Sequence, residues 1–585
     1  MKSAGRGVIG AMTVALASAG LFLVSLGKWT DPIVDIGNEW IWPDALSRGD
    51  LLYRDVVYWF GPLTPYFHSV FFRLFGSSFS ALVLAGCVAS LAILAAFFFA
   101  LRTVTGKREA ALWTAAAIPA LVFMRYSGGS ILGMGFRMWH AAGFALLAGA
   151  LASRAGGGRR RWYGAAAGAC AGLAGLCRTE WGMGALLAVL LGLAVRRSFG
   201  RGAVRESLPV IAAALGVFGS VIGAFVWIAG PDPVLRESLV LLSGIPPEVR
   251  KWLVDASGVR EWRRGVLSLL HSTAFWLAAY WLVEILTLRR IAPDRAKRRL
   301  PWLLACLALL AGGALLGPAR GSVLFSWSPA VCAAAVVVGL SRGPRGGNVV
   351  TFATMGLIFS GRRFFDLRDF GYAAPPILFA LVAAAGLMRH AVRREKGRSA
   401  RLRLRRAFQV AAVALVSFLF LLRGIQYRAD HRVPIPGTAG MLTGSETLAR
   451  ELTIAAREIR TRTPPGGGLV VFPDAAILNF LADRRNSLRH KLYVPGYLTE
   501  QNEAAVLSEL MRASPAAVAI VERADGQEPP RLFGVTYGRR IHGWIDRHYL
   551  MVRVEGGPPD AARGGYPMLL GFRRDAEPRP IIPAP

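Results

Sequence analysis

Residues 79–101, FSALVLAGCVASLAILAAFFFAL, indicate the fold class of the protein most directly. This stretch contains no charged residue and is long enough to cross the ~30 Å hydrocarbon core of a bilayer as a helix. Similar apolar blocks recur along the chain, in which 54% of the 585 residues are hydrophobic and only 18% are charged. Soluble chains carry about 25% charged residues. The composition therefore predicts a polytopic membrane protein, and it excludes collagen, coiled coil, disorder and a small disulfide scaffold.

The apolar blocks predict about thirteen membrane-spanning helices. They fall near residues 8–27, 79–101, 109–124, 139–153, 162–177, 182–195, 206–229, 267–288, 301–317, 322–340, 348–360, 373–388 and 407–423. The first block continues through Leu26, which indicates an uncleaved anchor rather than a removed signal peptide.

The charged residues predict the orientation of these helices. A formal charge of +33 could indicate nucleic-acid binding. The basic residues, however, concentrate in short segments between apolar blocks, which is the positive-inside pattern. The basic segments, predicted to be cytoplasmic, are 102–108, 154–161, 196–205, 289–300, 342–347 and 389–406. The other loops are 28–78, 125–138, 178–181, 230–266, 318–321 and 361–372. We therefore expect a multi-pass protein of the plasma (inner) membrane that contacts its lipids, binds no nucleic acid and has a cytoplasmic N-terminus.

Residues 1–423 are predicted to form the membrane domain, and residues 424–585 an extracytoplasmic α/β domain. Thr443 with Glu446 forms a capping-box pattern before an amphipathic run that ends near Arg460. Strand-like runs at 468–472 and 516–521 flank a helix-like run at 499–513. This alternation predicts a small layered sheet.

The first outer loop, residues 28–78, combines acidic with aromatic side chains and ends in an apolar stretch, 67–75, that could lie flat in the membrane interface. A carboxylate just outside a span is well placed to act on a lipid-linked substrate. The alternative is a solvated acidic loop with interfacial aromatic anchors. The acidic residues are Asp31, Asp35, Glu39, Asp44, Asp50 and Asp55.

Two other outer segments carry arginines. Arg178 and Glu180 lie between two very hydrophobic runs, where ionisable residues are costly and indicate function. Arg362, Arg363 and Arg368 lie together in the loop 361–372. Guanidinium groups bind phosphate oxygens well. The alternative is local pairing, of Arg178 with Glu180 and of the later arginines with neighbouring acids.

One acidic loop and two cationic segments on the same face suit the transfer of a group from a lipid phosphate. The carboxylate would act as general base on an acceptor hydroxyl, and the arginines would neutralise the departing phosphate. The sequence contains no Gly-x-x-x-x-Gly-Lys-Ser/Thr loop for a nucleotide, which fits a donor already activated on a lipid.

The order Asp35-x-Gly, then Gly49-Asp-x-Leu-Tyr53-Arg54-Asp55, then Gly61-Pro62-Leu63 resembles the first periplasmic loop of bacterial GT-C glycosyltransferases. The mannosyltransferase-like and aminoarabinose-transferase-like groups are the most similar. The resemblance is specific mainly across residues 31–76, and it extends in architecture to most of the chain. It implies inverting transfer of a hexosyl or pentosyl group from a polyprenyl-phosphate sugar to a cell-envelope glycan, lipid or protein.

Under this resemblance Asp35 matches the loop aspartate that acts as base, and Arg178 matches the basic residue near the donor phosphate. Arg362 and Arg363 match later basic positions only loosely. Many relatives have adjacent Asp-Glu, whereas Ile36 follows Asp35 here, so Asp31 and Glu39 remain alternatives for the base. We place Tyr53, Arg54, Asp55, Glu180 and Arg368 in the same predicted site. A divalent cation, Mg²⁺ or Mn²⁺, could bridge carboxylate and phosphate, although nothing in the sequence requires it.

Two other functions compete with the transferase. A transporter or flippase of lipid-linked saccharides would use the same outer arginines, but it would also place charges inside its spans. Apart from Glu284, most predicted span centres contain none. A non-catalytic scaffold with an outer interaction domain is the third hypothesis.

Overall fold

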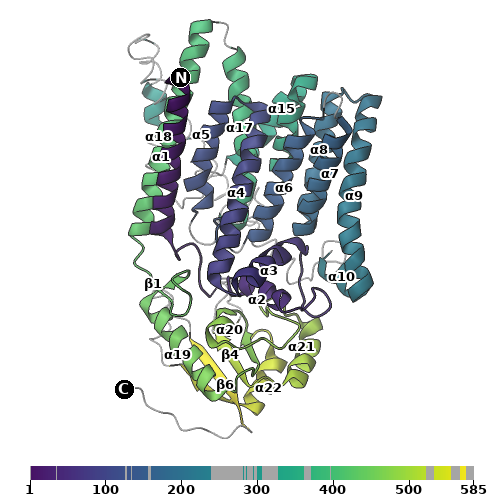
Figure 1. Ribbon diagram of the computed structural model, residues 1–585, viewed down its shortest axis with the longest axis vertical. Helices are drawn as coiled ribbons and strands as arrows, with labels where there is room; N and C mark the ends of the chain where they lie inside the picture. The colour runs from purple at the N-terminus through teal and green to yellow at the C-terminus, as the bar shows by residue number, and fades with distance from the viewer. Residues whose placement is uncertain are drawn as a thin grey trace.

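The structure is a computed structural model, and it is mostly helical (Figure 1). It describes residues 2–33, 36–124, 128–133, 135–155, 160–238, 327–360, 370–394, 397–521, 532–554 and 567–574, with scattered positions between 270 and 305.

Long helices lie side by side in the upper part of Figure 1. Most of the predicted apolar blocks that the structure describes lie within helices, because a continuous apolar segment satisfies its backbone groups internally only as a helix. The blocks near 267–288 and 301–317 lie mostly outside the described residues. The helices are α1 (Lys2–Ser25), α4 (Phe79–Val104), α5 (Lys107–Ala117), α6 (Phe136–Ala152), α7 (Arg160–Cys177), α8 (Thr179–Arg196), α9 (Arg201–Ala229), α15 (Ser328–Ser341), α16 (Gly347–Phe359), α17 (Phe370–Arg394) and α18 (Arg398–Arg428).

The surface of this helical part is apolar. Leu23 on α1 and Trp227 on α9 are 72% and 88% exposed. Soluble proteins rarely expose large contiguous apolar surface, so lipid is the natural environment of these faces. Three described helices, α4, α8 and α9, are long and apolar enough to cross a membrane.

Two short helices from residues 28–78, the predicted first outer loop, lie between the long helices and the C-terminal residues (Figure 1). These are α2 (Ile36–Ser47) and α3 (Leu63–Phe75), and nearly every residue of α2 is buried. On α3, Leu74 and Phe75 are exposed whereas His68 and Phe72 are buried, so the apolar stretch near 67–75 is amphipathic. A further short helix, α10 (Pro231–Ser238), follows α9.

The C-terminal residues form a four-stranded sheet with the order β3-β4-β6-β5. β3 (Leu469–Phe472) and β4 (Ala517–Val521) pair in parallel, and β6 (Met568–Arg573) pairs antiparallel with β4 and with β5 (Tyr549–Arg553). The side chains of Val471 and Ala519 pack in one apolar cluster with α19 (Glu446–Arg462) and α20 (Ile477–Ala482). Those of Val470 and Val518 pack on the other face with α21 (Glu500–Ala513) and α22 (Arg539–His548).

The two predicted strands and the predicted helix at 499–513 therefore lie within one or two residues of their expected positions. The predicted capping box at Thr443 and Glu446 is wrong. Ser445 caps α19 by accepting a hydrogen bond from the backbone N–H of Leu448. Thr443 instead lies in the short strand β2 (Thr443–Gly444), which pairs with β1 (Val433–Pro434), and its hydroxyl donates to the carbonyl of Gly27.

Candidate functional site

Helix α2 carries the candidate carboxylate Glu39 and packs directly against the C-terminal part. A Cβ atom on Gly37 would overlap the backbone at Ala476 and Ile477, so only glycine allows this close approach. The amide of Asn38 donates a 2.8 Å hydrogen bond to the carboxylate of Asp474. These contacts fix the helix, and with it the direction of the Glu39 side chain.

Glu39 forms a buried ion pair with Arg137, which lies in the first turn of α6. The Arg137 Nη2 and Glu39 Oε1 atoms are 3.3 Å apart, and the two residues are 7% and 4% exposed. Burial raises the pKa of Glu39 to about 7, although Arg137 lowers it. A carboxyl group with a pKa near neutrality exchanges a proton readily at physiological pH.

The ring of Phe60 lies next to two guanidinium groups. The guanidinium carbon of Arg137 is 4.0 Å from the ring centroid, and that of Arg178 is 5.2 Å away. Arg178 is the N-cap residue of α8, and its Nη2 atom is 2.5 Å from Oε1 of Glu180. The aromatic face stabilises both cations, which would otherwise repel each other across this short space.

Several buried N–H groups around this cluster have no hydrogen-bond partner among the residues that the structure describes. They include Nη1 of Arg137, Nε of Arg178 and the indole nitrogen of Trp42. The Trp42 ring centroid is 5.6 Å from the Arg137 guanidinium carbon. Buried donors are normally paired, so unpaired donors beside two cations make this a place where a phosphate or another anion would be held.

A buried polar layer from α3 and α6 lies next to Arg137. The Thr64 hydroxyl and Nδ1 of His140 are 3.1 Å apart, and the His68 and His140 ring centroids are 5.4 Å apart. Burial, together with the nearby His140 and Arg137, holds the pKa of His68 well below its usual range. His68 is therefore neutral, and it adds no third positive charge to the site.

The turn that contains Tyr53, Arg54 and Asp55 supports the cluster from the first outer loop. The Tyr53 hydroxyl donates a 2.6 Å hydrogen bond to the carbonyl of Phe60, and Tyr53 is fully buried. Arg54 and Asp55 pair with each other at 2.7 Å on the outer side of the turn. Tyr53 thus positions Phe60, whereas the Arg54–Asp55 pair faces away from it toward solvent.

Arg489, from the C-terminal part, holds this turn in place. Its guanidinium donates to the carbonyls of Tyr53 and Arg54 and pairs at 2.8 Å with Glu237 of α10. The other oxygen of Glu237 accepts a hydrogen bond from the backbone of Tyr58. One arginine therefore joins three segments that are far apart in the sequence.

The residues predicted from the sequence meet only in part. Glu39, Tyr53, Arg178 and Glu180 surround or support Phe60. The Oδ1 atom of Asp31 accepts a hydrogen bond from the backbone of Ile33, which makes it part of a local turn. Asp35, Arg362, Arg363 and Arg368 lie outside the described residues. No group of three or more His, Cys, Asp and Glu side chains in the described part could hold a metal ion.

Arg137, Phe60 and Arg489 were not predicted as site residues. Arg137 carries a weak signal, because it is a lone cation directly before an otherwise uncharged apolar block. Nothing in the sequence singles out Arg489 among the many arginines of the C-terminal part.

No protein-family model matches the chain, and no curated protein matches it. Solved structures do. The chain is similar to the crystal structure of ArnT from Cupriavidus metallidurans bound to undecaprenyl phosphate, with 14% identity, a TM-score of 0.49, and coverage of 97% of this chain and 99% of that one. It is also similar to the Archaeoglobus fulgidus oligosaccharyltransferase in complex with Zn and sulfate, with 14% identity, a TM-score of 0.48, and coverage of 87% and 67%. Both are GT-C glycosyltransferases, the group that residues 31–76 resemble.

Proposed function

We propose that the chain is an integral membrane glycosyltransferase that moves a sugar from a polyprenyl-phosphate donor to a cell-envelope acceptor, a glycan, lipid or protein. In this proposal the reaction takes place at the outer face of the plasma membrane and inverts the anomeric centre. The N-terminus is cytoplasmic, and residues 424–585 form an extracytoplasmic domain beside the site.

One observation carries this proposal: two guanidinium groups lie next to Phe60 beside a buried carboxylate, and each has an N–H without a partner in the described residues. The cluster lies where the first outer loop meets the ends of α6, α7 and α8. A lipid phosphate at the membrane surface would reach this level while its chain stays among the apolar helices.

In the proposed reaction, the hydroxyl oxygen of the acceptor attacks the anomeric carbon of the donor sugar. The bond between that carbon and the phosphate oxygen breaks, and the phosphate leaves with the electron pair. The acceptor proton passes to the base, for which we propose Asp35 on the resemblance of its loop. Arg137 and Arg178 would neutralise the charge that develops on the phosphate, and preorganised donors of this kind usually supply the largest share of catalysis.

The ion pair assigns Glu39 a different role from Asp35. A carboxylate 3.3 Å from a guanidinium within a buried pair holds that guanidinium in place. We therefore propose Glu39 as the positioning residue for Arg137. Asp31 is the weaker alternative for the base, because its carboxylate is used by the turn at Ile33. The later arginines, Arg362, Arg363 and Arg368, remain proposed phosphate ligands on their sequence alone.

A turnover assay tests the function. Purified protein would be given a radiolabelled polyprenyl-phosphate sugar, together with a cell-envelope extract as the source of acceptor, and scored for free lipid phosphate. We expect release by the wild-type protein and loss of release in Asp35→Asn. A flippase would move the labelled lipid across a vesicle without releasing phosphate. Unchanged release in Asp35→Asn, with Asp31→Asn and Glu39→Gln also active, would refute the proposed mechanism.

A further inference from the structure

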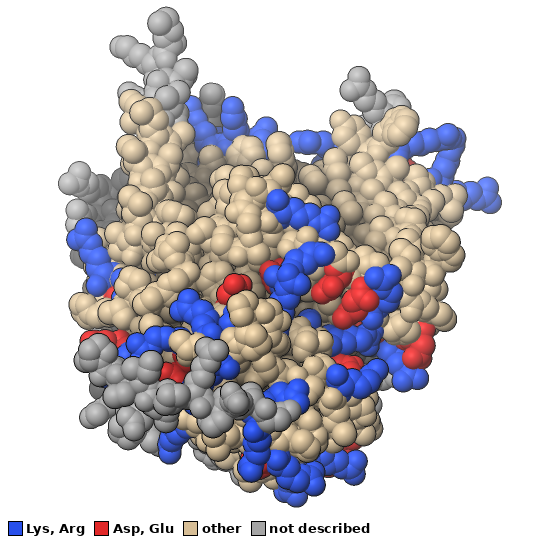
Figure 2. Space-filling view, turned by 60° about the horizontal axis from the view of Figure 1, so that its bottom comes forward, with Lys and Arg blue, Asp and Glu red and all other residues tan. Residues whose placement is uncertain are grey.

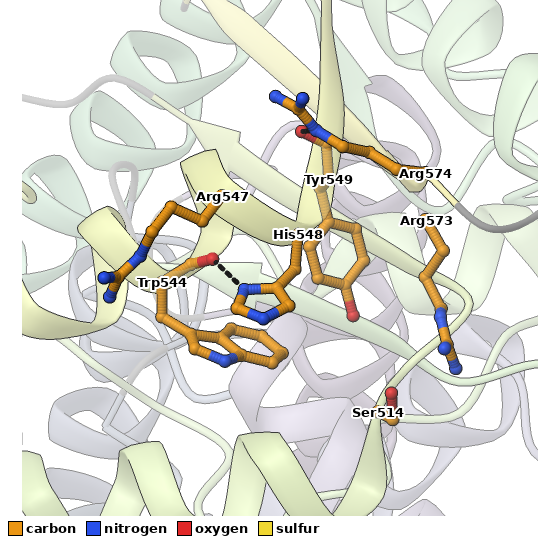
Figure 3. A pocket seen from close by; sticks show the side chains of 7 residues that line it. All are labelled: Ser514, Trp544, Arg547, His548, Tyr549, Arg573 and Arg574. Carbon is orange, nitrogen blue, oxygen red and sulfur yellow. Dashed lines mark hydrogen bonds between the residues drawn. The ribbon is translucent and has the colours of Figure 1, made fainter.

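A basic pocket lies at the end of the C-terminal part that is farthest from the long helices (Figures 1 and 3). Its volume is about 240 Å³, and it is formed where α22 runs into β5 and where β6 ends. Figure 3 shows Arg547 and Arg573 on opposite sides of the pocket, with His548 and Tyr549 between them and Arg574 above. No carboxylate is among its lining residues.

Two of the three arginines of this pocket, Arg547 and Arg574, are held by backbone oxygens. Nε of Arg547 donates to the carbonyl of Gly543, and the Arg574 guanidinium donates to the carbonyls of Tyr549 and Asp546. Each guanidinium group carries five N–H donors, so further N–H groups remain for a ligand. In the part of the chain that the structure describes, neither Arg547 nor Arg574 pairs with a carboxylate. The pocket is therefore suited to bind negative charge.

The spacing of these groups favours a ligand with several negative charges. A single phosphate would need guanidiniums that converge on one point, as in bidentate recognition, whereas Arg547 and Arg573 lie on opposite sides of the pocket. The stacked rings of Trp544 and His548, whose centroids are 4.6 Å apart, form part of the wall between them. An aromatic wall with cations at both ends fits a charged sugar chain.

A second cavity, of about 460 Å³, lies beside the pocket and reaches the first outer loop. The two cavities share Ser514 in their linings. The second is polar and contains both signs of charge, with Asp50 and Asp55 from the first outer loop and Arg485 and Lys491 from the C-terminal part. Figure 2 shows basic side chains gathered over the end of the molecule that the C-terminal residues form, and acidic ones nearer the helices.

We propose that these two cavities form one binding site for an extended saccharide that carries several anionic groups. Its charged repeats lie against Arg547, Arg573 and Arg574, and its other end passes Ser514 toward Asp50 and Asp55. That this saccharide is the acceptor rests on the function proposed above. A membrane lipid headgroup does not fit the site, because the arginine end lies at the opposite end of the molecule from the long helices (Figure 1).

Direct binding tests the proposal without any donor lipid. The full-length protein in detergent is titrated with a fluorescent dextran sulfate oligomer and with neutral dextran of the same length. We expect binding of the sulfated oligomer only. The double variant Arg547→Gln/Arg573→Gln should bind roughly 10²- to 10⁴-fold more weakly, since hydrogen bonds to charged groups contribute about 1.5–3 kcal/mol each.

The matched control is Arg450→Gln/Arg457→Gln, which removes two exposed arginines from α19 on the other face of the sheet. It should bind like the wild type. Equal loss in this control, equal binding of neutral dextran, or displacement by comparable concentrations of inorganic phosphate or dihexanoyl-phosphatidylglycerol would each overturn the proposal. If the double variant unfolds, the single variant Arg547→Gln, at an exposed position, takes its place in the binding test.

The same variants separate this proposal from the glycosyltransferase proposal. Without a saccharide acceptor, water can take the place of the acceptor hydroxyl, and this hydrolysis of the donor, which also releases lipid phosphate, should be unchanged in Arg547→Gln/Arg573→Gln. Loss of saccharide binding together with unchanged release supports the site. A protein that binds the sulfated oligomer through these arginines but releases no lipid phosphate would keep the site and refute only the enzymatic function.

Discussion

Replacing Arg137 by methionine leaves the carboxylate of Glu39 buried without its partner. At the observed 3.3 Å separation, the Coulomb attraction is about 5 kcal/mol for an effective dielectric constant of ~20. Breaking a buried pair by removing one partner costs about 3–5 kcal/mol. We therefore expect Arg137→Met, and Glu39→Gln to a similar degree, to lower the free energy of unfolding by about this amount.

The double variant Glu39→Gln/Arg137→Met removes both charges. Since no unpaired charge is then buried, its unfolding free energy should return to within about 1–2 kcal/mol of the wild type. Donor turnover should not return, because the proposed phosphate ligand is still missing. The expected loss is about 10²- to 10³-fold, the usual effect of removing one group that stabilises developing negative charge.

Both quantities can be measured on the same samples. Unfolding in detergent is followed by the fluorescence of the tryptophans, and turnover by release of labelled lipid phosphate. A stable double variant with wild-type turnover would refute the role of Arg137 at the phosphate. A double variant as unstable as either single one would refute the ion pair as the reason for their instability.

Three further predictions follow from single residues. Asp35→Asn should lower turnover by about 10²- to 10⁴-fold, whereas Asp31→Asn should cost less than about tenfold, since its amide oxygen can still accept the turn's hydrogen bond. Gly61→Ala should destabilise the protein by about 1–3 kcal/mol, because its Cβ would overlap the last turn of α7. The measurement is unfolding in detergent. The control Gly216→Ala, which has open space around it, should cause no loss of stability. Burial raises the pKa of Glu237 from 4.5 to about 7, so the folded protein retains a proton that the unfolded chain releases. Glu237 should therefore lower the stability by up to about 3 kcal/mol between pH 4.5 and pH 7. Glu237→Gln should remove this contribution and leave that of Glu39, whose pKa is raised to about 7 as well. An unchanged pH profile of stability in Glu237→Gln would contradict the raised pKa of Glu237.

The sequence predicted the long helices well because hydrophobicity alone determines them. An uncharged run such as residues 79–101 has one stable form in lipid, and the structure contains it as α4. The strands at 468–472 and 516–521 were also found, since short apolar runs between turns are typical of buried strands. In contrast, β5 and β6 were missed, because their runs are short and interrupted by Gly571 and by flanking arginines.

The candidate site was predicted less completely because its residues come together only through packing. Arg178 was recognised since it is an ionisable residue between two apolar blocks, and Glu39 as one of the acidic residues of the first outer loop and an alternative to Asp35 as the base. Their common neighbour Phe60 is an ordinary aromatic residue in sequence terms. Arg489 acts on the first outer loop from more than 400 positions away, and no local pattern reports such a contact.

Helix α2 limits which parts of this protein can be exchanged with those of another protein. Trp40 and Ile41 belong to the same apolar cluster as Leu452 and Ile477 of the C-terminal part. A chimera that exchanges everything after residue 430 would therefore replace part of the apolar surroundings of the helix that bears Glu39. Domain exchange with a relative should succeed only when the first outer loop and the C-terminal part are exchanged together.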